Sequence, residues 1–243
     1  MIMKTNATKL KWRIFGFLMF LLPIGALAQT PNAYLCGTGT VKLTPTFTGY
    51  APVAGDKIIW SINGTAQTPV NYNVPADAVY NIDPGLAPGN YKYSVQVVPA
   101  DANLCPSTAS DDMVIEKLPA PAIAVNAPGS TYCTDQTAST VLTASRTNTT
   151  YTLPTGVSMT YAWTATKDGA AVTTITDLGT ASTSGDTFTL KAGVAPAAYV
   201  FTATGSYATG GVQIVPATTC TATADKTITV TVKPGKATVT ITP

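Results

Sequence analysis

The chain has 243 residues, with 14 basic and 12 acidic side chains and no histidine. Without histidine, the Ser-His-Asp triad, the Cys-His dyad and nearly every catalytic zinc site are excluded. The chain is rich in threonine, alanine and valine, and no apolar stripe of helical period persists for three turns. This composition favours strands, because β-branched side chains suit a pleated, half-buried surface.

Residues 1–28 have the pattern of a secretory signal peptide. A basic segment precedes an apolar stretch at 14–22, and Ala26-Leu27-Ala28 forms the expected cleavage site. The apolar stretch is shorter than the roughly 20 residues that a spanning helix needs. Cleavage would leave ten basic and twelve acidic residues, a formal charge of −2, with Arg146 the only arginine. We therefore predict a secreted or cell-surface protein, exported by a Sec signal peptide, with no nucleic-acid partner.

Beyond the signal peptide, strands are predicted by alternation of apolar and polar residues. Clear examples are residues 41–44, 91–97 and 227–232. Asn63-Gly64 and Lys167-Asp168-Gly169 each follow such a run and predict hairpin turns. The chain is predicted to be all-β.

An internal repeat organises these strands. The first unit carries Cys36, Trp60, Tyr91, Cys105 and Pro119, and the second carries Cys133, Trp163, Tyr199, Cys220 and Pro234. The successive intervals are 24, 31, 14 and 14 residues in the first unit and 30, 36, 21 and 14 in the second. Length differences confined to a few segments are typical of loops between conserved strands. We predict two tandem immunoglobulin-like β-sandwich domains, at residues 29–118 and 119–234.

Residues 235–243 continue the pattern. The stretch from Pro234 to Pro243 aligns without a gap with the stretch from Pro119 to Pro128, which opens the second unit. It is predicted to be the opening strand of a missing third unit or a tail. An unpaired strand with an apolar face is prone to aggregate. We therefore expect residues 235–243 to pair with a sheet edge of their own chain or of a partner, or to belong to a longer chain.

The aromatic residues divide into repeated and unrepeated positions. Trp60 and Trp163 lie within predicted strands at matching places, which indicates core residues; a sugar-stacking platform is the alternative. Tyr91 and Tyr199 each follow a turn with matching Gly and Pro residues, an arrangement that resembles the E–F corner of a sandwich, where a tyrosine hydroxyl ties down the corner. Four tyrosines in loop-like segments have no repeat partner and are the candidate glycan contacts: Tyr50, Tyr72, Tyr151 and Tyr207.

The segment Cys36-Gly37-Thr38-Gly39-Thr40-Val41-Lys42-Leu43 resembles the opening of immunoglobulin-like and PKD-like repeats in secreted surface proteins of Bacteroidota. The later tryptophan, the Gly…Tyr strand and the cysteine before the last strand agree with this resemblance. The second unit departs from it at Cys133-Thr134-Asp135-Gln136, which lacks the glycine. The resemblance implies an adhesin or cargo of type IX secretion. Such cargo carries a C-terminal sorting domain that these residues do not include, so the chain would then be a fragment.

Four cysteines in an exported protein predict two disulfides. Repeat symmetry favours Cys36–Cys105 and Cys133–Cys220. Strict immunoglobulin order, however, places the two cysteines of a unit at opposite ends of the sandwich, beyond the Cα separation of about 7 Å that a disulfide tolerates. Pairing in another way therefore stays open.

Metal sites have little support in the sequence. There is no C-x-x-C pair and no histidine for zinc. A calcium site near Asp101 and the Cys105 loop is the alternative to solvated acids, although calcium needs six to eight oxygen ligands. No cofactor is expected.

These observations predict a non-enzymatic, secreted or cell-surface structural or adhesive module, with a proline-containing linker at Leu118-Pro119-Ala120-Pro121 that stiffens the junction. The alternative is a carbohydrate-binding module that uses the loop tyrosines. The expected partners are other surface proteins or glycans.

Overall fold

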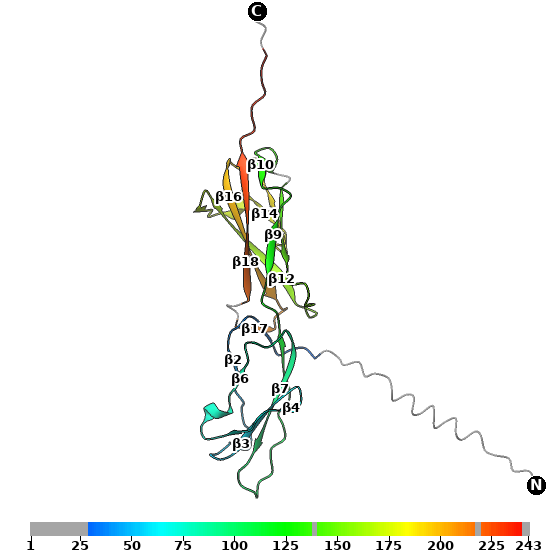
Figure 1. Ribbon diagram of the computed structural model, residues 1–243, viewed down its shortest axis with the longest axis vertical. Coiled ribbons are helices and arrows are strands. Elements are labelled where there is room, and N and C mark those ends of the chain that lie inside the picture. The colour runs from blue at the N-terminus through cyan, green and yellow to red at the C-terminus, as the bar shows by residue number, and fades with distance from the viewer. Residues whose placement is uncertain (1–28, 138–139, 217–219, 240–243) are drawn as a thin grey trace, which may run out of the picture. The chain divides into compact units, whose positions relative to one another are not determined.

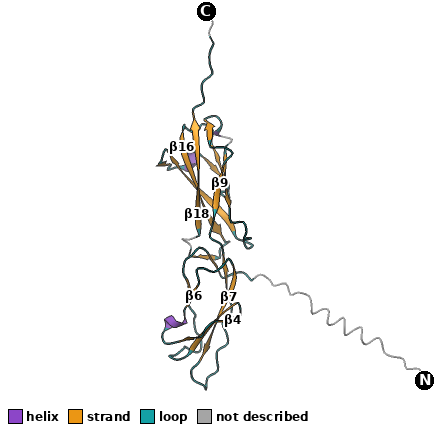
Figure 2. Ribbon diagram, viewed as in Figure 1, coloured by secondary structure: helices purple, strands orange, loops and turns teal. Residues whose placement is uncertain are grey.

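The computed structural model describes residues 29–137, 140–216 and 220–239. The described residues from Pro31 onward belong to one compact unit. The predicted signal peptide lies outside the described residues. The all-β prediction is confirmed: strands make up nearly all of the regular secondary structure in the described chain, and its helical segments are short 3-10 turns (Figure 2). Among the described residues, no helix is long and apolar enough to cross a membrane.

The N-terminal sandwich is built from the first eight strands. They are β1 (Ala33–Leu35), β2 (Val41–Leu43), β3 (Lys57–Ile62), β4 (Thr65–Ala66), β5 (Val70–Asn71), β6 (Tyr80–Ile82), β7 (Gly89–Val98) and β8 (Met113–Lys117). Strands β1, β8, β7, β3 and β4 lie side by side in one sheet, with β5 also paired to β3, and β2 pairs with β6 in the other. Asn63 and Gly64 both have positive φ and form the predicted hairpin turn between β3 and β4.

The C-terminal sandwich has longer strands (Figure 1). They are β9 (Ile123–Asn126), β10 (Thr131–Cys133), β11 (Val141–Arg146), β12 (Ser158–Lys167), β13 (Ala170–Ala171), β14 (Gly179–Ala181), β15 (Thr187–Leu190), β16 (Ala197–Ala208) and β18 (Thr221–Thr231). One sheet has the order β10-β18-β16-β12-β13 and the other β14-β15-β11-β9. Asp168 and Gly169, with positive φ, form the predicted turn between β12 and β13.

Each sandwich has its own apolar core. The N-terminal core includes Ile58, Trp60 and Tyr93, and the C-terminal core includes Trp163, Phe188 and Phe201. Both tryptophans are 7% exposed. Their indole N–H groups donate to the carbonyl oxygens of Ala78 (3.0 Å) and Gly185 (2.6 Å), which satisfies the polar atom of each buried ring.

The described residues after β18 form no strand. Residues 232–239 are exposed, and Val239 is 92% exposed. Residues 232–239 therefore pair with neither sandwich within the described part of the chain, and residues 240–243 of the predicted strand lie outside the described residues.

Candidate functional site at the junction of the sandwiches

A strand from the second repeat completes a sheet of the first. Strand β17 (Gln213–Val215) lies between β16 and β18 in the sequence but pairs in parallel with β1, matching Ala33 to Gln213 and Leu35 to Val215. The pairing continues one residue further, where the Cys36 amide donates to the Val215 carbonyl (3.2 Å). Val215 also packs against the N-terminal core. This is strand addition to an open sheet edge, the geometry that proteins use to recognise extended peptides.

A disulfide lies at the end of this pairing. Cys36 is bonded to Cys220, with the Cα atoms 5.5 Å apart, and Cys105 and Cys133 are free thiols. The expected pairing within each unit, Cys36–Cys105 and Cys133–Cys220, is therefore wrong.

The physical reason is strand length. Cys220 directly precedes β18, whereas Cys133 pairs with Thr231 at the far end of that strand. Ten residues of strand span roughly 33 Å, well beyond disulfide reach. In the N-terminal sandwich, Leu35 pairs with Lys117 at the end of β8, whereas Cys105 lies before that strand begins. The cysteines of one unit lie at opposite ends of their sandwich.

An apolar cluster surrounds the disulfide. Its buried members come from both repeats: Tyr34, Cys36, Leu118, Val157, Tyr207 and Cys220. Tyr151, Leu153, Met159, Val212 and Ile214 pack against it. Removing such side chains from water is the main favourable contribution to association between folded elements. We call these residues, together with β1 and β17, the junction.

Polar contacts fix the register of the junction. The buried Glu116 carboxylate accepts hydrogen bonds from the Asn90 side-chain Nδ2 (2.9 Å) and the Tyr151 hydroxyl (2.5 Å). Burial, and then the hydrogen bond to Glu116, raise the pKa of the Tyr151 phenol well above its usual value. The Tyr207 hydroxyl donates to the Pro119 carbonyl (3.2 Å), and the Asn148 side-chain Nδ2 donates to the Ala120 carbonyl (2.7 Å). Side chains of the C-terminal sandwich therefore hold the linker.

Close backbone approach adds a steric requirement. A Cβ atom on Gly39 would overlap the ring of Pro216, which follows β17. Only glycine fits at this position without a shift of one backbone. Gly39 belongs to the Cys36–Leu43 segment noted in the sequence, and the second unit has no glycine at the corresponding place.

Two of the four candidate glycan tyrosines belong to this junction. Tyr207 lies in strand β16 and is 6% exposed, which corrects the expectation of a loop residue. Tyr151 is half-buried, with its hydroxyl on Glu116. The burial of Tyr207 leaves little of its ring surface available for sugar stacking.

The other two tyrosines pack against the N-terminal core. Tyr50 donates its hydroxyl to Asp56 (2.7 Å), and Tyr72 is half-buried. The structure does not bring the four tyrosines together as one surface, since two serve the junction and two the N-terminal sandwich.

The repeated tyrosines take equivalent places. Tyr91 donates to the Ala87 carbonyl and Tyr199 to the Ala195 carbonyl, both at 2.9 Å and both four residues upstream. Each hydroxyl ties down the turn that leads into its strand, as in the tyrosine corner of immunoglobulin-like sandwiches.

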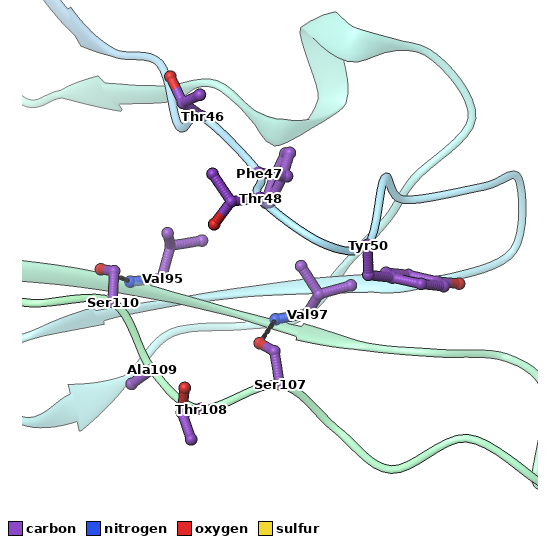
Figure 3. Close-up of a pocket in the computed structure, with 10 residues that line it drawn as sticks. All are labelled: Thr46, Phe47, Thr48, Tyr50, Val95, Val97, Ser107, Thr108, Ala109 and Ser110. Carbon is purple, nitrogen blue, oxygen red and sulfur yellow. Dashed lines mark hydrogen bonds between the residues drawn. The ribbon is translucent and has the colours of Figure 1, made fainter.

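A shallow hollow lies beside β7 in the N-terminal sandwich. Segment 46–50 and the stretch 107–110 face Val95 and Val97 across it (Figure 3). Its volume is ≈ 230 Å³, below the range of about 300–1,000 Å³ usual for ligand pockets. The hollow therefore adds no support to a small-molecule site.

Serine side chains close the strand edge next to this hollow. Beyond Tyr93, β7 is no longer paired with β8. There the Val95 and Val97 amides donate to the hydroxyl oxygens of Ser110 (3.0 Å) and Ser107 (2.9 Å). The amides of the same serines donate back to the carbonyls of Val95 and Val97, both at 2.9 Å. The edge is thus satisfied without a regular strand.

Asp101, the acid considered for a calcium site near Cys105, is engaged in local hydrogen bonds. Asp101 accepts hydrogen bonds from the amide and side chain of Asn103, both at 2.9 Å, and so stabilises its own turn. Within the described residues, no group of three or more His, Cys, Asp or Glu side chains could hold a metal ion.

The comparisons with known proteins return structures but no family. No family model matches the chain, and no curated protein matches it. Among solved structures, the chain is similar to fibronectin(III)-like modules of Clostridium thermocellum CbhA, with 11% identity and a TM-score of 0.37 over 84% of this chain and 92% of that one. It is also similar to the chicken CNTN1 FN1-FN3 domains (13% identity, TM-score 0.35, 81% of this chain and 62% of that one). A third similar structure is Sidekick-1 immunoglobulin domains 1-4 (14% identity, TM-score 0.34, 86% of this chain and 46% of that one).

Proposed function

We propose that the chain is a non-catalytic structural or adhesive module, secreted or held at the cell surface, whose two sandwiches act as one rigid spacer. The Cys36–Cys220 disulfide between the two repeats is the observation that carries the proposal. Tandem domains joined only by a linker move relative to one another by default unless their interface is large and hydrophobic. Here a covalent bond, a strand pairing and a shared apolar cluster all resist that motion.

A rigid spacer transmits position and force, which is the physical requirement on a surface module that presents something at a distance from its anchor. Disulfides persist in oxidising compartments outside the cytoplasm, which agrees with the predicted signal peptide. The mass of the exported protein tests export directly: we expect cleavage after Ala28, so a protein that retains residues 1–28 would contradict this part of the proposal.

The rigidity is tested by ¹⁵N relaxation of the oxidised chain. We expect amides of the two sandwiches, for example those of Ile58 and Phe201, to report one common rotational correlation time. In a Cys36→Ser/Cys220→Ser variant, the two sandwiches should report different, shorter values. Cys105→Ser is the matched control, because Cys105 is an exposed free thiol outside the junction. Separate correlation times in the oxidised wild-type chain would overturn the proposal.

A further inference from the structure

The two free cysteines occupy the same places in their repeats as the two bonded ones. Cys105 and Cys220 each lie 14 residues before the proline that ends the unit, in the connection before the last strand. Cys36 and Cys133 each lie at the end of a strand, β1 or β10, that runs parallel to that last strand. The observed bond therefore joins the first cysteine of one unit to the second cysteine of the next unit.

If the first cysteine of each unit bonds the second cysteine of the next unit, Cys133 and Cys105 are the two cysteines that still need a partner. Cys133 is the first cysteine of a unit and needs the second cysteine of a following unit, whereas Cys105 is the second cysteine of a unit and needs the first cysteine of a preceding one. Each lies at the end of its sandwich opposite the end that the Cys36–Cys220 bond joins. The two free thiols of one copy therefore cannot meet, but those of successive copies can.

We propose that a second copy of this chain is the partner, linked head to tail by a disulfide between Cys133 of one copy and Cys105 of the next. This goes beyond the rigid-spacer function, and it rests on that function only in that each copy must keep its Cys36–Cys220 bond.

The Cys133 end has an open strand edge. Strand β10 is the edge strand of its sheet, paired on one side with β18. Its counterpart β1 is paired on both sides, with β8 and with β17. Val232, just after β18, is 69% exposed. In the first repeat, the free side of β1 pairs with β17 of the next unit. The corresponding side of β10 is unpaired, and Cys133 lies at the end of this strand.

The Cys105 end presents exposed apolar groups. Leu104 is 46% exposed and Val53 is 57% exposed. Asp56 links their loops, since its carboxylate accepts hydrogen bonds from the Val53 amide and the Ala100 amide, both at 2.9 Å. A hollow of ≈ 140 Å³ lies beside the thiol, lined by Tyr50, Val97, Pro99, Leu104, Cys105 and Ser107. In the second repeat, the corresponding loops are the ones buried in the junction.

The contact between copies is weaker than the junction within a copy. The connection that carries Cys105 is seven residues shorter than the one that carries Cys220, where β17 lies. Thr131 and Lys233 also stand where the first repeat has the buried Tyr34 and Leu118. Copies should therefore separate when the bond is reduced, and the disulfide is what holds them.

The bond forms by thiol–disulfide exchange. The two thiols are oxidised to one disulfide, and their two electrons and two protons pass to a disulfide donor, such as oxidised glutathione or a disulfide oxidoreductase, which is reduced to two thiols. Because the bond joins Cys133 of one copy to Cys105 of the next, the contact is heterologous, and repeating it links copies into open chains where the rotation does not close a ring.

The test incubates the purified chain with oxidised glutathione and separates the products without reductant. We expect a ladder of covalent oligomers, lost on reduction, with a Cys105–Cys133 peptide found by mass spectrometry and Cys36–Cys220 intact in every rung. Cys105→Ser and Cys133→Ser should each stay monomeric alone, and mixing the two variants should give only a heterodimer.

Dimerisation of either single variant alone would overturn the head-to-tail pairing, because it requires like cysteines to join. A wild-type chain that stays monomeric while both thiols react with iodoacetamide would also overturn it, as would Cys36 or Cys220 within the linkage. The ¹⁵N relaxation of monomeric Cys105→Ser reports rigidity independently, so failure of oligomerisation and failure of the spacer function are distinguishable.

Discussion

The two sandwiches reach stability in different ways, although they share a repeat. In the C-terminal sandwich, β16 has twelve residues and is paired in unbroken register with both β12 and β18. In the N-terminal sandwich, β7 pairs with β8 only from Gly89 to Tyr93, serines cover the rest of that edge, and the sheet is completed by β17 from the second repeat. The comparison indicates that the C-terminal sandwich provides its own sheets, whereas the N-terminal one depends on its neighbour.

The largest expected effect comes from removing the covalent link. The bond closes a loop with a sequence separation of 184 residues, which the chain-entropy model values at about 5 kcal/mol. In Cys36→Ser/Cys220→Ser, we expect urea unfolding to begin in the N-terminal sandwich, because β17 is no longer tethered to β1. The Cys105→Ser control should unfold like the wild type. If the double variant is as stable as that control, the N-terminal sandwich does not depend on the disulfide.

Substitutions in the two cores should differ in whether they speed up hydrogen exchange in the other sandwich. Phe201→Ala removes a ring that is fully buried in the C-terminal core and should cost about 3–5 kcal/mol. Because this sandwich supplies β17, hydrogen exchange should also speed up at β1. Ile58→Ala, in the N-terminal core, should cost about 2–5 kcal/mol and leave the exchange of β16 unchanged. If each substitution speeds up hydrogen exchange equally in the other sandwich, the N-terminal sandwich does not depend on the C-terminal one more than the reverse.

Gly39→Ala probes the junction without touching either core. The added Cβ would overlap the Pro216 ring, and overpacking of this kind costs about 1–3 kcal/mol. We expect loosening of the β1–β17 pairing, seen as faster exchange of the Cys36 amide, while the C-terminal core stays protected. Gly235→Ala, where a Cβ meets open space, is the control.

The serine-covered edge should give a smaller, local effect. Ser107→Ala and Ser110→Ala each remove the acceptor for a β7 amide, which costs about 0.5–1.5 kcal/mol. Exchange should accelerate at Val97 in the first variant and at Val95 in the second. Thr108→Ala changes the same segment without losing such an acceptor, so an equal acceleration there would reject the assignment.

Acid should weaken the N-terminal sandwich through Asp56. Hydrogen bonds from the Val53 amide, the Ala100 amide and the Tyr50 hydroxyl lower the pKa of this carboxyl below its usual value. Its contribution is therefore present above the unfolded-state pKa and is lost as the pH falls through the folded-state pKa. Urea unfolding at pH 7 and pH 3 should show a smaller difference in Asp56→Asn than in the wild type. If the stability difference between pH 7 and pH 3 is the same in Asp56→Asn as in the wild type, Asp56 does not cause the loss of stability in acid.

Local features of the fold could be predicted from local sequence. Asn-Gly and Asp-Gly identify two hairpin turns because few other pairs adopt positive φ. The Gly-Pro turns before Tyr91 and Tyr199 mark the corners, because the hydroxyl of each tyrosine reaches a carbonyl only four residues back.

The junction could not be predicted in this way. The segment between Tyr199 and Cys220, which contains β17, is seven residues longer than its counterpart in the first repeat. From the sequence alone this looks like a longer loop, because the hydrogen-bond partners of β17 lie in the other repeat. Repeat symmetry favours disulfides within units, because it treats equivalent cysteines alike and does not indicate at which end of a sandwich each cysteine lies. The sequence does not show that β16 extends to Tyr207, because the first repeat has no corresponding tyrosine.

Disulfide mapping of the unreduced protein tests the central claim most directly. After proteolysis and mass spectrometry without reductant, we expect a peptide pair that joins Cys36 to Cys220 in the monomer, with Cys105 and Cys133 alkylatable as free thiols. Recovery of Cys36–Cys105 and Cys133–Cys220 peptides instead would contradict the locked junction.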